Sequence, residues 1–226
     1  MKLKGKTYTV ANATSLLGRD LAKTLAEEGA NLILSGLDHV ELDTLLKELE
    51  ETTEGNHNVV LLQPSKEIDW LNVLEEIQND YDSLSGIILV HSIFTENRSI
   101  YEVSFEEFNE VMYEHVWGTY LGTRTLRPLL KDEADAKIIN VIEPSFEDVY
   151  ERNLYYTATG AIEALTHSTA IEMSKEDVDV YALSYRPNVK QDEEKFERSN
   201  PKAISVILDI LTGEEKKPTG ETIIIS

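Results

Sequence analysis

Short apolar runs alternate with segments of helical periodicity along the whole chain, and this alternation limits the possible folds more than any other feature. Most of these runs are apolar throughout, which is typical of strands that are buried on both faces of a parallel sheet. The expected strands are residues 7–11, 31–35, 58–63, 87–91, 137–142, 178–183 and 222–225. The pattern predicts an α/β fold with a doubly wound parallel sheet of seven strands and helices on both faces. Residues 1–226 are expected to form a single domain.

Helices are expected between the strands, and several of them carry terminal signals. They cover residues 16–28, a stretch that begins at 38, and residues 65–79, 105–128, 153–173 and 200–211. Asp38 and Ser104 are each followed three residues later by a glutamate, which is the spacing of a capping box. Gly29 and Gly213 follow expected helices where glycine often ends one. These signals predict where the helices that carry them begin or end.

The charge balance and the residue types exclude several classes of function. The 42 acidic side chains outnumber the 21 basic ones, which gives a net charge of −21. Such a surface repels the phosphates of nucleic acids and anionic membranes, so neither is an expected partner. The chain has no cysteine, and no apolar run approaches the ~18 residues of a membrane helix. Together with an N-terminus that lacks the layout of a signal peptide, these features predict a cytoplasmic protein.

The order of these segments resembles the short-chain dehydrogenase/reductase (SDR) family over essentially the whole chain. The residues that carry the resemblance are Gly18, Gly118, Asn140, Tyr156 with Ala158, and the terminal Thr219 and Gly220. The resemblance implies a Rossmann-like sheet and an oxidoreductase that uses NAD or NADP. It also implies that helices 105–128 and 153–173 pair with their copies in a homo-dimer or homo-tetramer.

The family's glycine-rich nucleotide loop, TGxxxGxG, lies over residues 11–18 of this chain. Asn12 and Leu16 stand where the first two glycines belong, and Gly18 is retained. A dinucleotide site needs these glycines because the backbone must turn tightly and approach the pyrophosphate. Asparagine tolerates a left-handed conformation, so the turn can form with Asn12, whereas Leu16 is expected to fill the volume of the phosphates. Gly18 is expected to serve the packing of helix against strand.

The other cofactor positions of the family differ as well. Small and apolar residues replace the acid or base that contacts the ribose, and Gln63 replaces the aspartate beside the adenine. The family's NNAG stretch reads His91-Ser-Ile-Phe94, and its last two side chains are expected to crowd the pocket. Asn12, Gly18, Gln63 and His91 thus occupy the family's cofactor-binding positions. We nevertheless expect a plugged groove and no bound cofactor.

The resemblance places the family's catalytic Asn, Ser, Tyr and Lys on His115, Glu143, Tyr156 and Gly160, so that only the tyrosine is retained. A tyrosine with no cation beside it is too weak a base to oxidise an alcohol near neutral pH, since the reference pKa of tyrosine is ~10. A carboxylate in place of the serine repels a developing alkoxide. These changes predict that the chain performs no hydride transfer.

Three functions remain compatible with these residues. The first is a pseudoenzyme with the dehydrogenase fold that acts through binding, assembly or regulation. The second is an atypical oxidoreductase that uses NAD or NADP, for which family membership is the only support. The third is a repurposed acid/base site of His115, Glu143 and Tyr156 that needs no nicotinamide. The same cleft could hold a metal on His91, His115 and Glu143, although a satisfied polar cluster is the simpler explanation. The sequence favours the pseudoenzyme.

Overall fold

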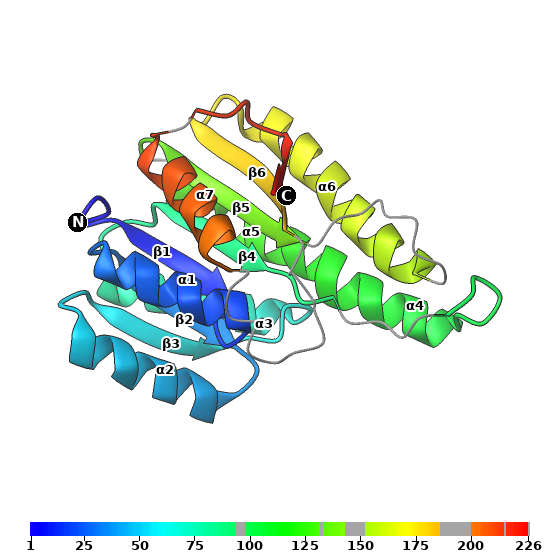
Figure 1. The fold of residues 1–226 in the computed structure, drawn as a ribbon, viewed down its shortest axis with the longest axis horizontal. Coiled ribbons are helices and arrows are strands. Elements are labelled where there is room, and N and C mark those ends of the chain that lie inside the picture. The colour runs from blue at the N-terminus through cyan, green and yellow to red at the C-terminus, as the bar shows by residue number, and fades with distance from the viewer. Residues whose placement is uncertain (94–97, 132, 143–151, 186–199, 215, 226) are drawn as a thin grey trace.

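The computed structural model describes residues 1–93, 98–131, 133–142, 152–185, 200–214 and 216–225, which contain one seven-stranded sheet (Figure 1). The strands are β1 (Thr7–Ala11), β2 (Asn31–Gly36), β3 (His57–Leu61), β4 (Gly86–Val90), β5 (Ala136–Ile142), β6 (Val178–Tyr185) and β7 (Thr222–Ile225). All neighbouring strands are parallel, in the order β3-β2-β1-β4-β5-β6-β7. The prediction of a doubly wound, seven-stranded parallel sheet is therefore confirmed.

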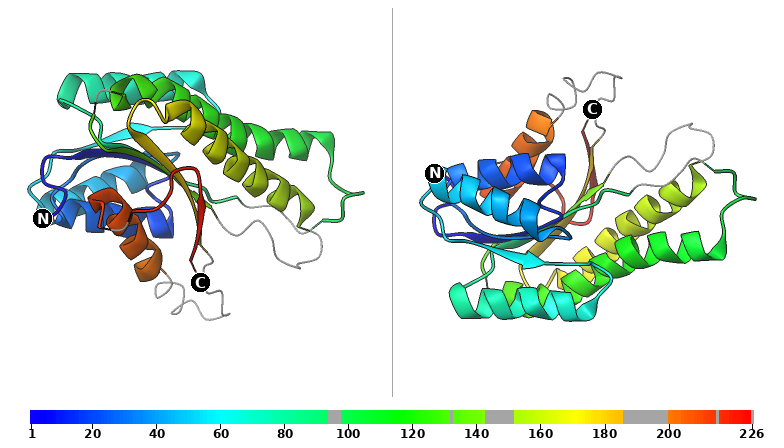
Figure 2. Two further views of the ribbon diagram at one scale, coloured as in Figure 1. Left: turned by 90° about the horizontal axis from the view of Figure 1, so that it is seen from above. Right: turned by 90° about the horizontal axis from the view of Figure 1, so that it is seen from below.

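Helices cover both faces of this sheet (Figures 1 and 2). The described helices are α1 (Leu16–Glu27), α2 (His39–Thr52), α3 (Glu67–Asp80), α4 (Phe105–Val111), the π-helix η1 (Met112–Trp117), α5 (Gly118–Leu130), α6 (Asn153–Met173) and α7 (Asn200–Thr212). Helices α1, α2 and α7 pack on one face, and α3, α5 and α6 pack on the other. Every residue of β1, β4 and β5 is buried between these layers, which explains why their sequences are largely apolar.

Most of the terminal signals in the sequence act as expected, although the described structure shows only the Asp38 half of the capping box expected at α2. The Asp38 side chain accepts hydrogen bonds from two backbone N–H groups in the first turn of α2. Ser104 and Glu107 form a reciprocal capping box at the start of α4. Gly29 and Gly213 adopt positive φ angles of 88° and 68° just after α1 and α7. These local interactions set the helix boundaries independently of the rest of the fold.

The long helix expected over residues 105–128 is not uniform, and this prediction needs correction. Six residues, Met112–Trp117, form a π-helical segment between α4 and α5. The wider i→i+5 turn changes the direction in which the following side chains point, and such segments occur frequently at functional sites. No glycine or proline lies within Met112–Trp117, so the sequence carries no signal for the interruption. This segment contributes two residues to the pocket described below.

Two glycines inside helices on the same face of the sheet lead to opposite predictions. A Cβ added at Gly160 in α6 would meet no atom within 4 Å, whereas one at Gly122 in α5 would lie 2.6 Å from the indole of Trp70. Alanine favours helix over glycine by about 1 kcal/mol, so Gly160→Ala should raise the free energy of unfolding by that amount. Gly122→Ala gains the same propensity but overpacks the core, which costs about 1–3 kcal/mol. Urea unfolding of both variants measures the difference, and equal effects would contradict the packing described here.

Candidate functional site

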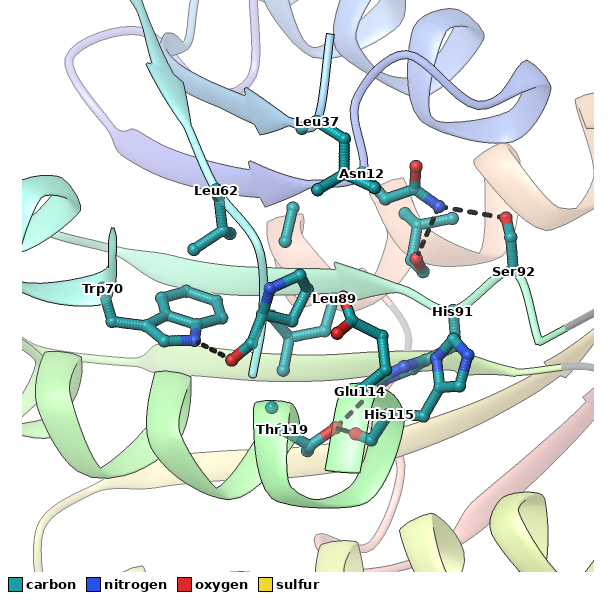
Figure 3. Close-up of a pocket in the computed structure, with 15 residues that line it drawn as sticks. Asn12, Leu37, Leu62, Trp70, Leu89, His91, Ser92, Glu114, His115 and Thr119 are labelled. Atoms are coloured by element: carbon teal, nitrogen blue, oxygen red, sulfur yellow. Dashed lines mark hydrogen bonds between the residues drawn. The ribbon is translucent and has the colours of Figure 1, made fainter. Parts of the chain in front are cut away.

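A pocket of about 350 Å³ lies at the carboxyl ends of β1, β2 and β4 (Figure 3). It is close to the point where the strand order reverses between β1 and β4, and open α/β sheets bind their ligands at such a point. Its lining residues are Ala11, Asn12, Gly36, Leu37, Leu62, Pro64, Trp70, Leu89, Val90, His91, Ser92, Glu114, His115, Gly118 and Thr119. The volume is at the lower end of the range of about 300–1,000 Å³ for small-molecule sites.

One wall of the pocket is apolar and tightly packed. The fully buried Trp70 of α3 donates a hydrogen bond from its indole nitrogen to the Pro64 carbonyl at 2.8 Å. A Cβ on Gly118 of α5 would lie 2.7 Å from the Pro64 Cβ, so α5 approaches this segment as closely as glycine allows. Leu62 and Leu89 complete the apolar surface. This side of the pocket is therefore apolar and tightly packed.

Asn12 holds the loop after β1 in the conformation expected from its residue type. Its φ angle is 59°, in the left-handed region, which confirms that the turn forms with asparagine in place of glycine. Its side-chain amide donates to the Val90 carbonyl at 3.1 Å and to the Ser92 hydroxyl at 3.0 Å. Asn12 thus ties the end of β1 to the end of β4 at the rim of the pocket.

Gly18 and Leu16 lie at the N-terminus of α1 and do not line the pocket. A Cβ on Gly18 would be 2.4 Å from the Asn12 carbonyl oxygen, so this glycine is required for the packing of helix against loop. The backbone N–H of Gly18 donates to the Ser15 hydroxyl at 3.2 Å. Leu16 is half exposed. The space beside Asn12 is open, so the expected groove is not plugged there, whereas the filling of the phosphate volume by Leu16 stays a prediction.

Gln63 does not line the pocket either, although it occupies a cofactor position of the family. Its backbone N–H donates to the Asp69 carboxylate at 2.8 Å. Its neighbours Leu62 and Pro64 do line the pocket. Side chains alternate between opposite sides along an extended segment, which explains why the two neighbours contribute and Gln63 does not. Phe94, which was expected to crowd the pocket, lies outside the described residues.

His91 and His115 meet edge to face in the pocket, with ring centroids 6.2 Å apart. Burial, together with the neighbouring His115, lowers the pKa of His91 to about 3, against a hydrogen bond with Asn140 that raises it. Burial also lowers the pKa of His115 to about 4. The Thr119 hydroxyl lies 3.4 Å from Nε2 of His91 and donates to the His115 carbonyl at 2.6 Å. Both imidazoles are therefore uncharged at neutral pH.

These neutral imidazoles predict acid sensitivity. The pKa values of His91 and His115 are lower in the folded state than the unfolded value of about 6.5. The two rings therefore contribute their full share to the free energy of unfolding above pH 6.5, and this share is lost as the pH falls toward 4. Each should reduce the free energy of unfolding by about 1.4 kcal/mol per pH unit in that window. Some carboxylates also have a lowered pKa, such as Glu107, where a backbone hydrogen bond from Ser104 is the main cause. These groups reduce the free energy of unfolding only below about pH 4.5.

Urea unfolding between pH 7 and pH 5 measures this slope. His115→Asn removes one of the two titrating rings of the pocket and should reduce the slope by about 1.4 kcal/mol per pH unit. An unchanged slope in this variant would contradict the buried, neutral state of the ring.

Three of the four catalytic positions inferred from the family, His115, Tyr156 and Gly160, lie in the described residues. The Tyr156 hydroxyl is buried and has no hydrogen-bond partner there, so His115 and Tyr156 are not bonded to one another. Gly160 leaves open space where the family has lysine. The guanidinium of Arg152 lies 6.0 Å from the Tyr156 ring centroid, which corrects the expectation that no cation lies near this tyrosine. It faces the ring and does not replace the lysine. Glu143 lies outside the described residues.

The described residues contain no group of three histidine or acidic side chains that could hold a metal ion. Glu143, the third ligand in the metal alternative, is not among them. None of the described helices is both long enough and apolar enough to cross a membrane.

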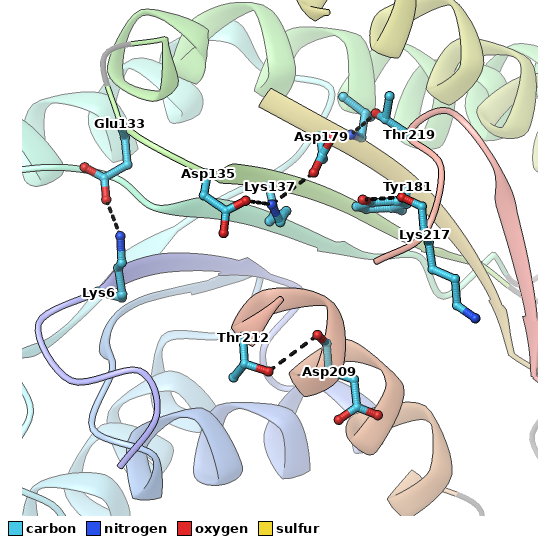
Figure 4. A network of polar contacts seen from close by, with 11 residues as sticks. Lys6, Glu133, Asp135, Lys137, Asp179, Tyr181, Asp209, Thr212, Lys217 and Thr219 are labelled. Carbon is cyan, nitrogen blue, oxygen red and sulfur yellow. Dashed lines mark hydrogen bonds and ion pairs between the residues drawn. The ribbon is translucent and has the colours of Figure 1, made fainter. Parts of the chain in front are cut away.

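A second polar cluster lies at the amino ends of the strands, opposite the pocket, where β5 and β6 begin (Figure 4). The buried Lys137 of β5 forms ion pairs with Asp135 and Asp179, the latter at 3.0 Å. Nearby, Lys6 pairs with Glu133 at 2.8 Å. None of these residues lines the pocket, so we assign the cluster a structural role.

Comparisons with known proteins agree with this architecture. A family model described as "Enoyl-(Acyl carrier protein) reductase" matches residues 10–204. An uncharacterized oxidoreductase of Staphylococcus saprophyticus is 23% identical over 186 residues, which cover 81% of this chain and 79% of the relative. A 3-oxoacyl-[acyl-carrier-protein] reductase of Aquifex aeolicus is 25% identical over 186 residues, 81% of this chain and 74% of the relative.

Solved structures share the fold over nearly the whole chain. Levodione reductase superposes with a TM-score of 0.89 at 15% identity, covering 99% of this chain and 97% of its own. The 3-ketoacyl-(acyl-carrier-protein) reductase from Brucella melitensis, complexed with NADH, gives a TM-score of 0.86 at 21% identity, with coverage of 99% and 97%.

Proposed function

The chain belongs to the short-chain dehydrogenase/reductase family, and from this premise we propose that it is a pseudoenzyme, which keeps part of the nucleotide pocket for binding but performs no hydride transfer. Fold alone does not establish an activity, so the proposal rests on the residues of the pocket. Two observations carry it together. The pocket beside Asn12 and His91 is open, and Gly160 offers no side chain where the family has its catalytic lysine.

The residues fit the adenosine half of a dinucleotide. In Rossmann-like folds the adenosine ribose lies beyond the end of the second strand, and here Gly36 and Leu37 form part of the pocket at that point. The apolar residues Leu62, Pro64 and Trp70 line the same pocket, and such a lining suits a heterocyclic ring. The Brucella reductase, which shares the fold, is complexed with NADH, and this supports a nucleotide-type ligand for this chain. We infer that this half of the site is retained.

The residues do not fit the other half. At the N-terminus of α1, the Gly18 N–H already donates to Ser15, and no described cation lines the pocket to receive a pyrophosphate. Gly160 supplies no ammonium group to hold a ribose or to activate the Tyr156 phenol. We therefore propose that no nicotinamide cofactor is held productively.

The alternative, an atypical NAD(P)-dependent oxidoreductase, is favoured by the names of the relatives. Calorimetric titration with NAD, NADH, NADP and NADPH, together with absorbance assays of nicotinamide oxidation, separates the two proposals. We expect no submillimolar dinucleotide binding and no hydride transfer. Submillimolar binding accompanied by turnover of a carbonyl or alcohol substrate would establish the oxidoreductase instead.

Tyr156→Phe gives a second, independent test. Because the Tyr156 hydroxyl is buried without a partner in the described structure, its removal should raise the free energy of unfolding by about 1 kcal/mol. Tyr181→Phe is the matched control, because the Tyr181 hydroxyl donates to the Lys217 carbonyl at 3.1 Å. Removing this hydrogen bond should lower the free energy of unfolding by about 1 kcal/mol. In a working reductase the tyrosine would contribute about 10²–10⁴-fold to the rate, so any measurable turnover abolished by Tyr156→Phe would argue against a pseudoenzyme.

We also propose that helices α4–α5 and α6 pair with their copies in a homo-oligomer. An exposed aromatic row supports this: Phe105 and Phe108 of α4 are exposed, and Trp117 stacks between the exposed Tyr113 and Tyr120. Exposed apolar rows of this kind often mark interfaces. Sedimentation equilibrium at micromolar concentration is the test, and a strict monomer would rule the assembly out.

A further inference from the structure

We propose that the outer edge of β3 binds an extended, cationic segment of a partner protein as an additional strand of the sheet. The inference goes beyond the proposed function, because none of the residues that carry it lines the pocket. It depends on the free backbone groups of β3, on the lack of the features that protect an edge strand and on the charges of the two flanking helices.

β3 is the last strand at one edge of the sheet, and β2 is its only neighbour among the described strands (Figure 1). The Leu62 N–H donates to the Gly36 carbonyl of β2 at 2.9 Å, so the even-numbered residues of this segment bond to β2. The alternate residues therefore direct their N–H and C=O groups outward. These residues are His57, Val59 and Leu61. They offer a row of unpaired donors and acceptors to a further strand.

β3 lacks the features that usually protect an edge strand, which are lysines, prolines and bulges. Residues His57–Leu61 include no charged residue and no proline. Their register with β2 continues one to one along the whole strand, so no bulge interrupts it. The side chain of Leu61 is 46% exposed, and those of Val59 and Val60 are partly exposed. The edge is therefore accessible and regular enough to accept a strand.

The helices beside β3 make this edge negative. The side-chain amide of Asn58 donates to the carboxylates of Glu76 and Asp80 in α3, the latter at 3.0 Å. Neither carboxylate has an ion-pair partner in the described part of the chain. On the other face of the sheet, the exposed Glu50 and Glu51 lie in the last turn of α2, which leads into β3. Acidic side chains thus flank the strand on both sides.

These charges favour a cationic partner over a second copy of the chain. A helix C-terminus carries partial negative charge and is stabilised by cations, yet neither α2 nor α3 has a basic residue in its last turn. A cationic segment along β3 would reduce this repulsion and gain electrostatic attraction. A second copy would bring the same acids, on a chain with a net charge of −21, to the same edge.

The two faces of β3 indicate the pattern of the added strand. Asn58 points to the carboxylates of α3, whereas Val59 packs with the apolar cluster on the α2 face. Neighbouring strands align their alternating side chains, so the partner should place basic residues on one face and apolar residues on the other. The expected occupant is a strand in which lysine or arginine alternates with apolar residues.

Fluorescence anisotropy with a labelled heptapeptide of alternating lysine and valine tests the proposal. We expect a dissociation constant on the order of 10–100 µM at low salt. The same peptide with glutamate in place of lysine should bind at least about tenfold more weakly. N-methylation of the valines or of the lysines removes alternate N–H groups. One of these two peptides should lose about tenfold in affinity and the other should keep it, because an added strand bonds through alternate residues.

Substitutions on the protein locate the binding edge. Leu61→Lys places a like charge on β3 and should weaken the lysine–valine peptide about tenfold. Ile224→Lys, at a 77% exposed position of β7 on the opposite edge, is the matched control and should leave the affinity unchanged. The double variant Glu76→Gln/Asp80→Asn should weaken binding about threefold and reduce its salt dependence. Equal thermal midpoints for the variants verify that folding is intact.

Four outcomes would overturn the inference. The peptide does not bind at millimolar concentration; both N-methylated peptides bind as tightly as the parent, which indicates charge attraction alone; or Leu61→Lys and Ile224→Lys have equal effects. The fourth is self-association of the protein that Leu61→Lys abolishes in sedimentation, since the occupant is then a second copy. None of these results bears on dinucleotide binding or hydride transfer, so the proposed function is tested separately.

Discussion

Replacing both Asp135 and Asp179 with asparagine should lower the free energy of unfolding by about 3–5 kcal/mol. These two carboxylates are ion-pair partners of Lys137, whose side chain is only 5% exposed in β5 (Figure 4). Without them the ammonium group is left buried and without a compensating charge, and this is strongly destabilising. Asparagine suits position 135 because Asp135 has a positive φ of 63°, which asparagine also tolerates.

The same pair of substitutions should become far less damaging once the lysine is removed. Lys137→Met keeps the apolar stem and eliminates the buried charge, so the triple variant should recover most of the lost stability. Lys137→Met alone should cost little, since the side chains of Asp135 and Asp179 are 68% and 40% exposed and can remain hydrated. Urea unfolding at pH 7 measures this cycle, and additive effects of the three substitutions would refute the account.

Glu133→Gln serves as the control for a partly exposed ion pair. Its partner Lys6 has a side chain that is 43% exposed, so the loss of this pair should cost at most about 1 kcal/mol. The comparison separates the cost of an unpaired buried charge from the general effect of removing an acid from a chain with a net charge of −21.

The fold could be predicted because its signals are local and repeated. Each strand carries enough apolar residues to be recognised alone, and helix starts such as Asp38 and Ser104 form their hydrogen bonds within one turn. The interruption by η1 could not be predicted, because Met112–Trp117 contains no residue type that favours a wide turn. A π-helical segment depends on how the flanking helices pack, and that information is not local.

The pocket could be predicted only where the family positions coincide with its walls. Asn12, His91 and His115 were expected near a cleft and do line it, whereas Gln63 was expected there and does not. Glu114 was missed because it occupies none of the family's site positions, and adjacent residues of an α-helix point about 100° apart, so an α-helix would turn only one of Glu114 and His115 toward the pocket. The wider turn of η1 allows both to line the pocket.

Trp70→Ala should lower the free energy of unfolding by about 3–5 kcal/mol, the usual cost of deleting a large buried aromatic side chain. Trp70 of α3 is fully buried in the same core cluster as residues of α5, and it also lines the pocket. Trp70→Phe should cost less because a ring remains, although the Pro64 carbonyl loses its indole donor. Leu71→Ala, at a 44% exposed position on the same helix, is the control and should stay within about 0.5 kcal/mol of wild type.

The close contact between Trp70 and Gly122 predicts a reversal of sign. In the wild-type background, Gly122→Ala overpacks the indole, because the added Cβ would lie 2.6 Å from the nearest ring carbon. In the Trp70→Ala background that obstacle is gone, so the same substitution should stabilise α5 by about 1 kcal/mol through helix propensity and also fill part of the cavity. A double-mutant cycle by urea unfolding measures the coupling. If Gly122→Ala has the same effect in both backgrounds, the indole is not what requires glycine at this position.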